Sequence, residues 1–191
     1  MEILDWDAFI INEEKSPFAA TIGVFDGVHR GHQVLIERAV RQRERPTVIT
    51  FRQNPKRALA HQGGRDVISL EEKLDILEKM GIIRVILIDF SETFSKMEGQ
   101  VFIEALLDRG LSFLAVGENF RCGYHRNIGV EVIRRVMAER GVEIDIVPPV
   151  LLDGRLISSS MIREAITRGD FSFVSTALGR EFKELGMGSR E

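Results

Sequence analysis

The sequence predicts an α/β fold in which one parallel β-sheet is covered by helices on both faces. Short apolar runs of strand type alternate with amphipathic helical stretches along the chain. Several helical stretches end at a glycine that a new apolar run follows at once. The length of 191 residues is enough for one well-formed core.

Five apolar runs are expected to form strands because each is short, rich in Val, Ile or Phe, and bounded by glycine, proline or charge. The runs span residues 19–25, 47–51, 83–89, 113–116 and 143–147. Strands connected through helices lie parallel, and ligands bind beyond their carboxyl ends. His29, His32 and Asn54 follow predicted strands closely, so we expect them at that edge of the sheet.

Five helices are expected at residues 31–43, 70–80, 99–109, 130–140 and 160–168. Ser69 and Glu72 form a capping-box pattern at the start of the second helix. Four glycines are placed to end helices, namely Gly81, Gly110, Gly141 and Gly169. The polar residues 55–68 are expected to form a mobile loop or a small excursion, and residues 180–191 a frayed tail.

The composition is that of an ordinary globular protein. Hydrophobic residues make up 44% and charged residues 29%, and the net charge of −3 provides no general attraction to nucleic acid or anionic membranes. The single cysteine, Cys122, excludes a disulfide within the chain and is compatible with the cytoplasm, which is the expected location. We expect no signal peptide and no membrane-spanning segment.

The segment TIGVFDGVHRGH at residues 21–32 is the most informative of the chain. An apolar run breaks at Gly27, and His29 and His32 flank Gly31 where a helical pattern begins. A helix N-terminus offers unpaired N–H groups, and glycines allow a phosphate to approach the backbone. Histidines at i and i+3 share one face and supply donors to a charged phosphate. The segment indicates a nucleotide site and favours nucleotidyl transfer, whereas an isolated pair of histidines would more often be a surface or capping feature.

The segment ISSSMIR at residues 157–163 forms a second candidate phosphate site. Three serines lead into a predicted helix, and Arg163 follows one turn later. Serine hydroxyls and an arginine fork both suit phosphate oxygens, but Ser158 or Ser159 would serve equally well as an ordinary helix cap. Together with the histidine segment, this segment indicates a triphosphate clamp.

The segment GENFRCGYHRNIG at residues 117–129 follows a predicted strand and mixes glycines, aromatic rings and polar groups. Such a loop suits a flat ring beside a phosphate, although a long surface loop has a similar composition. The role of Asp26 stays open between orienting a donor, approaching magnesium and closing the turn. Cys122 is expected to pack, and the histidines together with Cys122 do not make a convincing zinc site.

Taken together, these segments resemble the adenylyltransferase module of the bacterial FAD synthetases, which are bifunctional riboflavin kinase/FMN adenylyltransferases. The segment LGR at residues 178–180 is similar to the end of that module, so the resemblance covers nearly the whole chain. It implies a Rossmann-like nucleotidyltransferase fold over residues 1–182, followed by a polar tail at residues 183–191. It also implies that ATP and FMN are converted to FAD and pyrophosphate, with Mg2+ entering with ATP and with neither nucleic acid nor membrane as a partner.

The resemblance also assigns residues to roles. The implied catalytic residues are His29, His32 and Arg163. The implied ATP-binding residues are Gly23, Phe25, Asp26, Gly27, Gly31, Arg155, Ser158, Ser159 and Ser160. The implied flavin-binding residues are Asn54, Asn119, Phe120, Arg121 and Tyr124. No residue is expected to bind a metal directly.

The chain departs from the family pattern in three places. Residues 50–55 read TFRQNP where the family commonly has an acid-Pro-His-Pro stretch, and Cys122 stands where phenylalanine is frequent. The riboflavin kinase module of the family is absent from this sequence, so kinase activity is not expected. Two alternatives stay open: a nucleotidyltransferase of the same fold with another phosphate acceptor, and a non-catalytic regulator that binds flavin or nucleotide.

Overall fold

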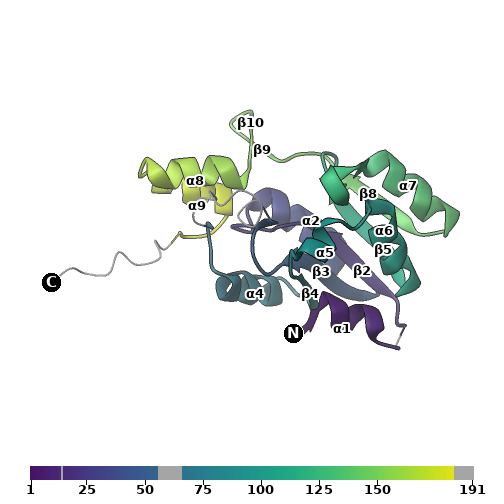
Figure 1. Ribbon diagram of the computed structural model, residues 1–191. Coiled ribbons are helices and arrows are strands. Elements are labelled where there is room, and N and C mark those ends of the chain that lie inside the picture. Colours follow the sequence, from purple (N-terminus) through teal and green to yellow (C-terminus); the bar gives the residue numbers. More distant parts are fainter. Residues whose placement is uncertain (14, 56–65, 183–191) are drawn as a thin grey trace.

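The computed structural model describes residues 1–13, 15–55 and 66–182 and shows a central sheet of six strands (Figure 1). The strand order is β1-β4-β3-β2-β5-β8, and every neighbouring pair is parallel. The strands are β1 Glu2–Asp5, β2 Phe18–Ile22, β3 Arg45–Phe51, β4 Arg84–Ile88, β5 Leu111–Gly117 and β8 Glu143–Val147. The chain order reverses direction across the sheet at β2, which lies between β3 and β5.

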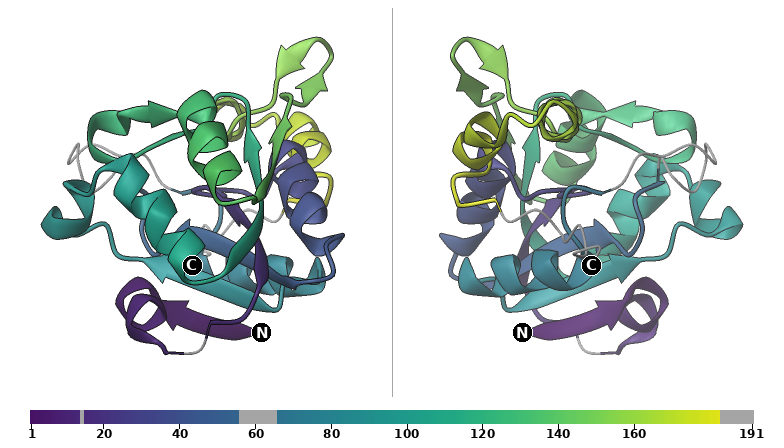
Figure 2. Two further views of the ribbon diagram at one scale, coloured as in Figure 1. Left: turned by 90° about the vertical axis from the view of Figure 1, so that its right-hand side faces the viewer. Right: turned by 90° about the vertical axis from the view of Figure 1, so that its left-hand side faces the viewer.

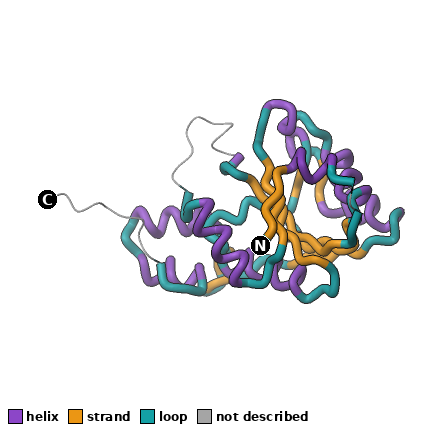
Figure 3. The backbone as a smooth tube through the Cα atoms, turned by 90° about the horizontal axis from the view of Figure 1, so that it is seen from below, coloured by secondary structure: helices purple, strands orange, loops and turns teal. Residues whose placement is uncertain are grey.

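Helices cover both faces of this sheet, as predicted (Figure 3). One face packs against α1 Trp6–Ile11, α6 Gly99–Asp108 and α7 Val130–Glu139. The other packs against α2 Arg30–Val40, α4 Leu70–Lys79, α8 Ser159–Thr167 and α9 Phe171–Leu178. Alternate residues of one strand serve the two cores: in β4, Ile86 and Ile88 belong to the first, and Val85 and Leu87 to the second.

The five predicted strands and five predicted helices are all present, with corrected ends. The run predicted at residues 19–25 is a strand only up to Ile22. The Gly23 amide still donates to the Ile49 carbonyl oxygen, and the backbone then turns to φ 52° at Phe25. The helix predicted at residues 31–43 ends at Val40. Ser69 accepts a hydrogen bond from the Glu72 amide, which confirms the N-terminal cap of α4.

All four glycines predicted to end helices adopt a positive φ. At Gly110 (φ 99°) a side chain would also be excluded sterically, because a Cβ atom would lie 2.9 Å from the Ser16 carbonyl oxygen.

Several short elements were not predicted from the sequence. β1 has only two apolar residues in four, yet it adds to the edge of the sheet beside β4. Small hairpins pair β6 Arg121–Cys122 with β7 Ile128–Gly129, and β9 Leu151–Leu152 with β10 Arg155–Leu156. The β9–β10 hairpin projects from the body of the molecule (Figure 2). The helices α1 and α9, the short helix α5 Glu92–Ser95 and the 3-10 turn η1 Tyr124–Arg126 were not predicted either.

Two predictions fall partly outside the described residues. These are the expected loop at residues 55–68, of which 56–65 are not described, and the expected frayed tail at residues 180–191, of which 183–191 are not described. Fraying is wrong for residues 180–182, because Arg180 donates to the carbonyl oxygens of Gly27 and Val28, and the Phe182 amide donates to the Ser175 hydroxyl. In the described ranges, no helix has both the length and the apolar character needed to cross a membrane.

The packing of β4 predicts a strong difference between two isoleucines of the same segment. Ile86 is fully buried in the sheet, whereas the Ile83 side chain is 48% exposed. We expect Ile86→Ala to lower the free energy of unfolding by about 2–5 kcal/mol, because it leaves a cavity in the core. The matched control Ile83→Ala should change it by less than about 1 kcal/mol. Urea denaturation measures both, and equal losses would contradict the burial described here.

Candidate functional site

A cavity of about 400 Å³ opens at the carboxyl ends of β2, β5 and β8, the edge predicted for ligand binding. This cavity, called the central cavity below, lies where the chain order reverses across the sheet. Its lining combines the β2–α2 loop (residues 23–29), the start of α2, the segment after β5 and the start of α8. Its volume falls in the range of small-molecule sites.

The β2–α2 loop is held in an uncommon conformation. Phe25 and Val28 have positive φ angles of 52° and 41°, although both carry side chains, and both side chains are fully buried. Gly27, with φ 84°, lies between them. Strained backbone of this kind persists only where the surroundings enforce it, and it is concentrated at functional sites.

Groups from the C-terminal segment and from α2 enforce this conformation. The Arg180 guanidinium donates to the carbonyl oxygens of Gly27 (2.8 Å) and Val28 (3.3 Å). The Gln33 amide donates to the carbonyl oxygens of Val28 (2.9 Å) and Leu178 (2.7 Å). The β2–α2 loop is therefore held in part by Arg180, which lies about 150 positions away in the chain.

His29 and His32 lie together on one face, as their spacing predicts. Their rings stack 3.6 Å apart with an interplanar angle of 20°. Gly31 makes room for this arrangement, because a Cβ atom at that position would lie 3.2 Å from the His29 ring. Both imidazoles line the central cavity.

Both histidines are neutral before an anion binds. Burial lowers the pKa of His29 from 6.5 to about 4, and burial together with the nearby His29 and Lys73 lowers the pKa of His32. Within the described part of the chain, neither Nδ1 atom has a hydrogen-bond partner. A buried polar atom without a partner is unfavourable, so this pair is poised to interact with a ligand.

Asp26 connects the two candidate phosphate segments. Its carboxylate accepts hydrogen bonds from the Val67 amide (2.8 Å) and from Arg163 (2.5 Å). Its main-chain oxygen accepts from the Ser159 hydroxyl (2.9 Å). Of the three roles left open for Asp26, the structure supports the orientation of a donor, which is the Arg163 guanidinium.

Burial raises the pKa of Asp26 above 3.8, while the Val67 amide and the positive charges of Arg163 and Lys73 act in the opposite direction. The ion pair with Arg163 therefore depends on these compensating groups, because an isolated buried carboxylate would take up a proton.

The serine segment caps α8 and also lines the central cavity. Ser158 accepts from the Met161 amide (3.2 Å), which is the ordinary capping role considered from the sequence. Ser160 accepts from Arg163 (3.2 Å). Both α2 and α8 thus begin at the cavity, and each N-terminus contributes partial positive charge there.

Most of the residues singled out from the sequence line the central cavity. Those that do are Gly23, Phe25, Asp26, His29, Gly31, His32, Asn54, Asn119, Phe120, Ser158, Ser159, Ser160 and Arg163. Four others are not part of its lining: Gly27, Arg121, Tyr124 and Arg155.

These four residues have other surroundings. Gly27 shapes the β2–α2 loop, and Arg155 is exposed on the β9–β10 hairpin. Arg121 donates to the Arg126 carbonyl oxygen, and Tyr124 is exposed and packs on His125 with ring centroids 4.0 Å apart. Cys122 is partly buried against the core, and burial raises its thiol pKa to about 12, in agreement with a packing role.

Sequence reasoning missed the apolar wall of the cavity and one buried amine beside it. The wall is formed by Ile22, Leu35, Val147, Pro148, Pro149, Val150, Leu156 and Ile157. The Pro148–Pro149 pair directly after a predicted strand is the signal that would have indicated this wall. Lys73 gave no signal, because it lies within an ordinary amphipathic helix.

Solved structures support the fold. A Streptococcus pneumoniae protein described as a macrolide-efflux protein superposes with a TM-score of 0.80 at 25% identity, over 94% of this chain and 62% of that one. A pantoate-beta-alanine ligase from Francisella tularensis superposes with a TM-score of 0.56 at 14% identity, over 94% of this chain and 85% of that one. The second likeness concerns the fold alone.

Sequence comparison identifies the family. A bifunctional riboflavin kinase/FMN adenylyltransferase from Pseudomonas fluorescens is 30% identical over 182 residues, and one from Escherichia coli K12 is 32% identical over 173 residues. These matches cover 92% and 87% of this chain but 58% and 55% of the relatives. A Geobacillus thermodenitrificans protein is 32% identical over 160 residues, which cover 83% of this chain and 87% of that protein. The FAD synthetase family model matches residues 11–161, and the chain therefore belongs to the FAD synthetase family.

Proposed function

We propose that this chain transfers AMP from ATP to FMN, which forms FAD and pyrophosphate. One observation carries the proposal: the segments 23–32 and 158–163 both contribute side chains to the lining of a single cavity, and the Asp26–Arg163 ion pair joins them. These two segments belong to the pattern on which the family resemblance rests. The names of the relatives from Pseudomonas fluorescens and Escherichia coli include the same transfer activity.

The chemistry requires no covalent enzyme intermediate. An oxygen of the FMN phosphate attacks the α-phosphorus of ATP and forms a new P–O bond. The bond between the α-phosphorus and the bridging oxygen breaks, and its electron pair leaves with pyrophosphate. The attacking oxygen is already anionic, so the enzyme contributes mainly position and stabilisation of negative charge.

The positive groups of the central cavity suit this task. The N-termini of α2 and α8, the Arg163 guanidinium and the imidazole donors of His29 and His32 all lie where the polyphosphate would bind. Arg163 offers a forked contact, and Asp26 and Ser160 hold it in place.

The lining of the cavity offers two kinds of contact. The apolar wall, which includes Pro148, Pro149 and Leu156, suits the adenine ring, whereas Asn54, Asn119 and Phe120 offer amides and an aromatic ring to the flavin nucleotide. Arg121 and Tyr124 would contact the flavin only if it extends beyond the cavity toward β6 and η1.

A protein-held Mg2+ does not fit the residues of this site. Asp26 and Glu118 are the acidic residues among the described residues that line the cavity, and Asp26 is already bonded to Val67 and Arg163. The described ranges contain no cluster of three or more metal-ligating side chains. We therefore propose that Mg2+ enters with ATP as part of the nucleotide substrate, as its hydration chemistry favours.

The direct test is an assay of pyrophosphate release with ATP and Mg2+, with FAD identified by chromatography. We expect FAD from FMN and none from riboflavin, because riboflavin carries no phosphate to attack ATP. Pyrophosphate release only with a pantetheine, nicotinamide or glycerol phosphate acceptor would overturn the proposed acceptor. Tight binding of ATP or FMN without pyrophosphate release would support a regulator instead.

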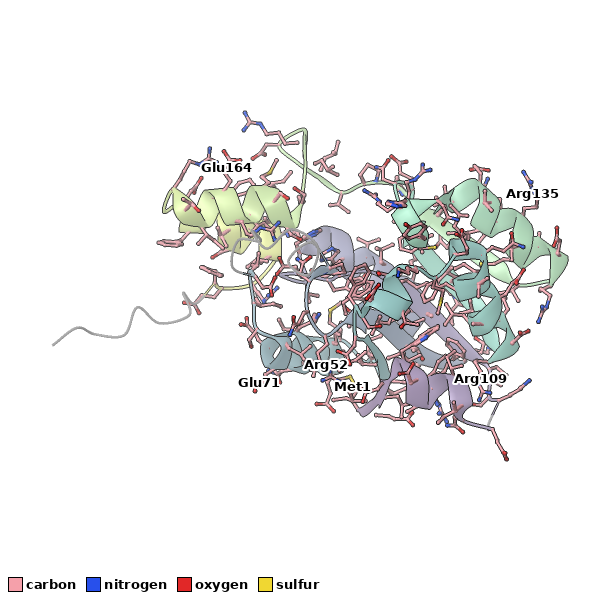
Figure 4. All side chains as sticks on the ribbon, in the orientation of Figure 1. Met1, Arg52, Glu71, Arg109, Arg135 and Glu164 are labelled. Carbon is pink, nitrogen blue, oxygen red and sulfur yellow. The ribbon has the colours of Figure 1, made fainter. Side chains whose placement is uncertain are left out.

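The forked contact of Arg163 gives a second prediction. Arg163→Lys should lower kcat/KM for ATP roughly 10- to 100-fold, because a lysine ammonium lacks the planar fork whose separate nitrogens contact Asp26 and Ser160 and suit a two-pronged phosphate contact. Arg168→Lys is the matched control, since Arg168 is the C-cap of the same helix and pairs with Glu164, and both side chains are exposed. Figure 4 labels Glu164 on the outer side of α8. Steady-state kinetics of both variants decides the matter, and wild-type values for Arg163→Lys would count against the clamp.

The neutral histidine pair gives a third prediction. A bound polyphosphate favours the charged imidazole, so ATP should raise the pKa of His29 from its value of about 4. By linkage, the affinity for ATP should then increase as the pH falls through the raised pKa and toward the value of about 4 in the free protein. NMR titration of the histidine signals with and without ATP measures the shift, and the exposed His125 serves as reference. A His29 pKa that is already near 6.5 without ligand would contradict the burial argument.

A further inference from the structure

Lys73 has surroundings that an ordinary helical lysine does not have. It is only 7% exposed, although it lies in the first half of α4. Its Nζ atom donates to the Val24 carbonyl oxygen (3.3 Å), the Thr50 hydroxyl (3.2 Å) and the Phe51 carbonyl oxygen (3.1 Å). These three acceptors match the three hydrogens of an ammonium group, and lysine is rarely buried without such partners.

The three contacts connect two segments that lead into the central cavity, the β2–α2 loop and the end of β3. Val24 belongs to the β2–α2 loop, which continues directly into Asp26 and His29. Phe51 ends β3 and leads to Asn54 on the acceptor side of the cavity. The Thr50 hydroxyl also donates to the Val24 carbonyl oxygen (3.1 Å), so one ammonium and one hydroxyl together tie the loop to the end of β3.

The charge of Lys73 also acts on the phosphate side. A second cavity of about 30 Å³ lies among Lys73, Asp26, Asp66 and Asn54, next to Arg52. The positive charge of Lys73 lowers the pKa of Asp26 and so favours the carboxylate that holds Arg163. Burial lowers the pKa of Lys73 to about 8, and the negative charges of Asp26 and Asp66 oppose this lowering in part.

We propose that Lys73 is a positioning residue of this site, whose ammonium holds the β2–α2 loop against the end of β3 and thereby sets Asp26 and Arg163 for the phosphates of ATP. This inference rests on the proposed use of ATP. Lys73 acts through the backbone of Val24 and Phe51 and through the charge of Asp26.

The first test compares ATP binding by wild-type protein, Lys73→Met and Lys79→Met in isothermal titration calorimetry at pH 7. Lys79 lies on the same helix, but its side chain is 73% exposed and pairs with Asp75. We expect Lys73→Met to weaken ATP binding about tenfold or more, since it removes hydrogen bonds from a charged donor, and Lys79→Met to leave binding unchanged. Equal affinities of wild-type protein and a folded Lys73→Met variant would overturn the proposal.

The pH dependence of binding separates positioning from a purely structural role. The groups that face Lys73 are Asp26 of the β2–α2 loop, Asp66 before α4, His32 of α2 and Arg52 after β3. Of these groups, we expect Lys73 to lose its proton near pH 8, so ATP affinity should fall as the pH rises through this region. Lys73→Arg keeps its charge and should bind ATP without this loss. An ATP affinity whose pH dependence is the same in wild-type protein and in Lys73→Arg would overturn the proposal, even if Lys73→Met does not fold.

Formation of FAD is measured separately on the same proteins. If wild-type protein binds ATP but makes no FAD from FMN, the proposed acceptor fails while the role of Lys73 is still decided by the calorimetry. If wild-type protein binds no ATP, both proposals are overturned. Circular dichroism of each variant establishes that the compared proteins are folded.

Discussion

The ion pair between Asp26 and Arg163 is the interaction on which the site depends. The two residues are 137 positions apart, and their contact fixes α8 against the loop that follows β2. The Ser159 hydroxyl reinforces this contact through the Asp26 carbonyl oxygen, and the Val67 amide fixes the other carboxylate oxygen. A carboxylate that is buried in this way is stable only with such partners, so loss of one partner affects the others.

The strained loop before α2 needs a rigid frame, and several distant segments supply it. Arg180 and Gln33 donate hydrogen bonds to the carbonyl oxygens of the turn. The buried Phe25 ring packs against the His32 ring, with ring centroids 5.2 Å apart. Lys73 fastens the start of the same loop from the opposite side. Because the loop is fixed from several directions, its two helix-side histidines are oriented before a ligand arrives, which reduces the entropy lost on binding.

The site keeps its positive character without a group of unpaired buried cations. Two helix N-termini and neutral imidazoles provide donors, and Arg163 is balanced by Asp26. Fixed dipoles avoid the large desolvation cost of several unpaired cations in one cavity. Negative charge that develops during transfer would meet donors that are already oriented.

The sequence by itself determined the α/β class, the five main strands and helices, and the segments that line the site, because these depend on local periodicity and on glycine and histidine spacing. The tertiary structure decided which residues act together. Only folding brings Lys73 to Val24 and Phe51, Arg180 to Gly27, and Arg163 to Asp26. The tertiary structure also shows that Tyr124 and Arg155 do not line the cavity, since a long side chain near a motif need not point toward the ligand of that motif. Local patterns report backbone conformation and burial, whereas partners distant in the chain are chosen by packing.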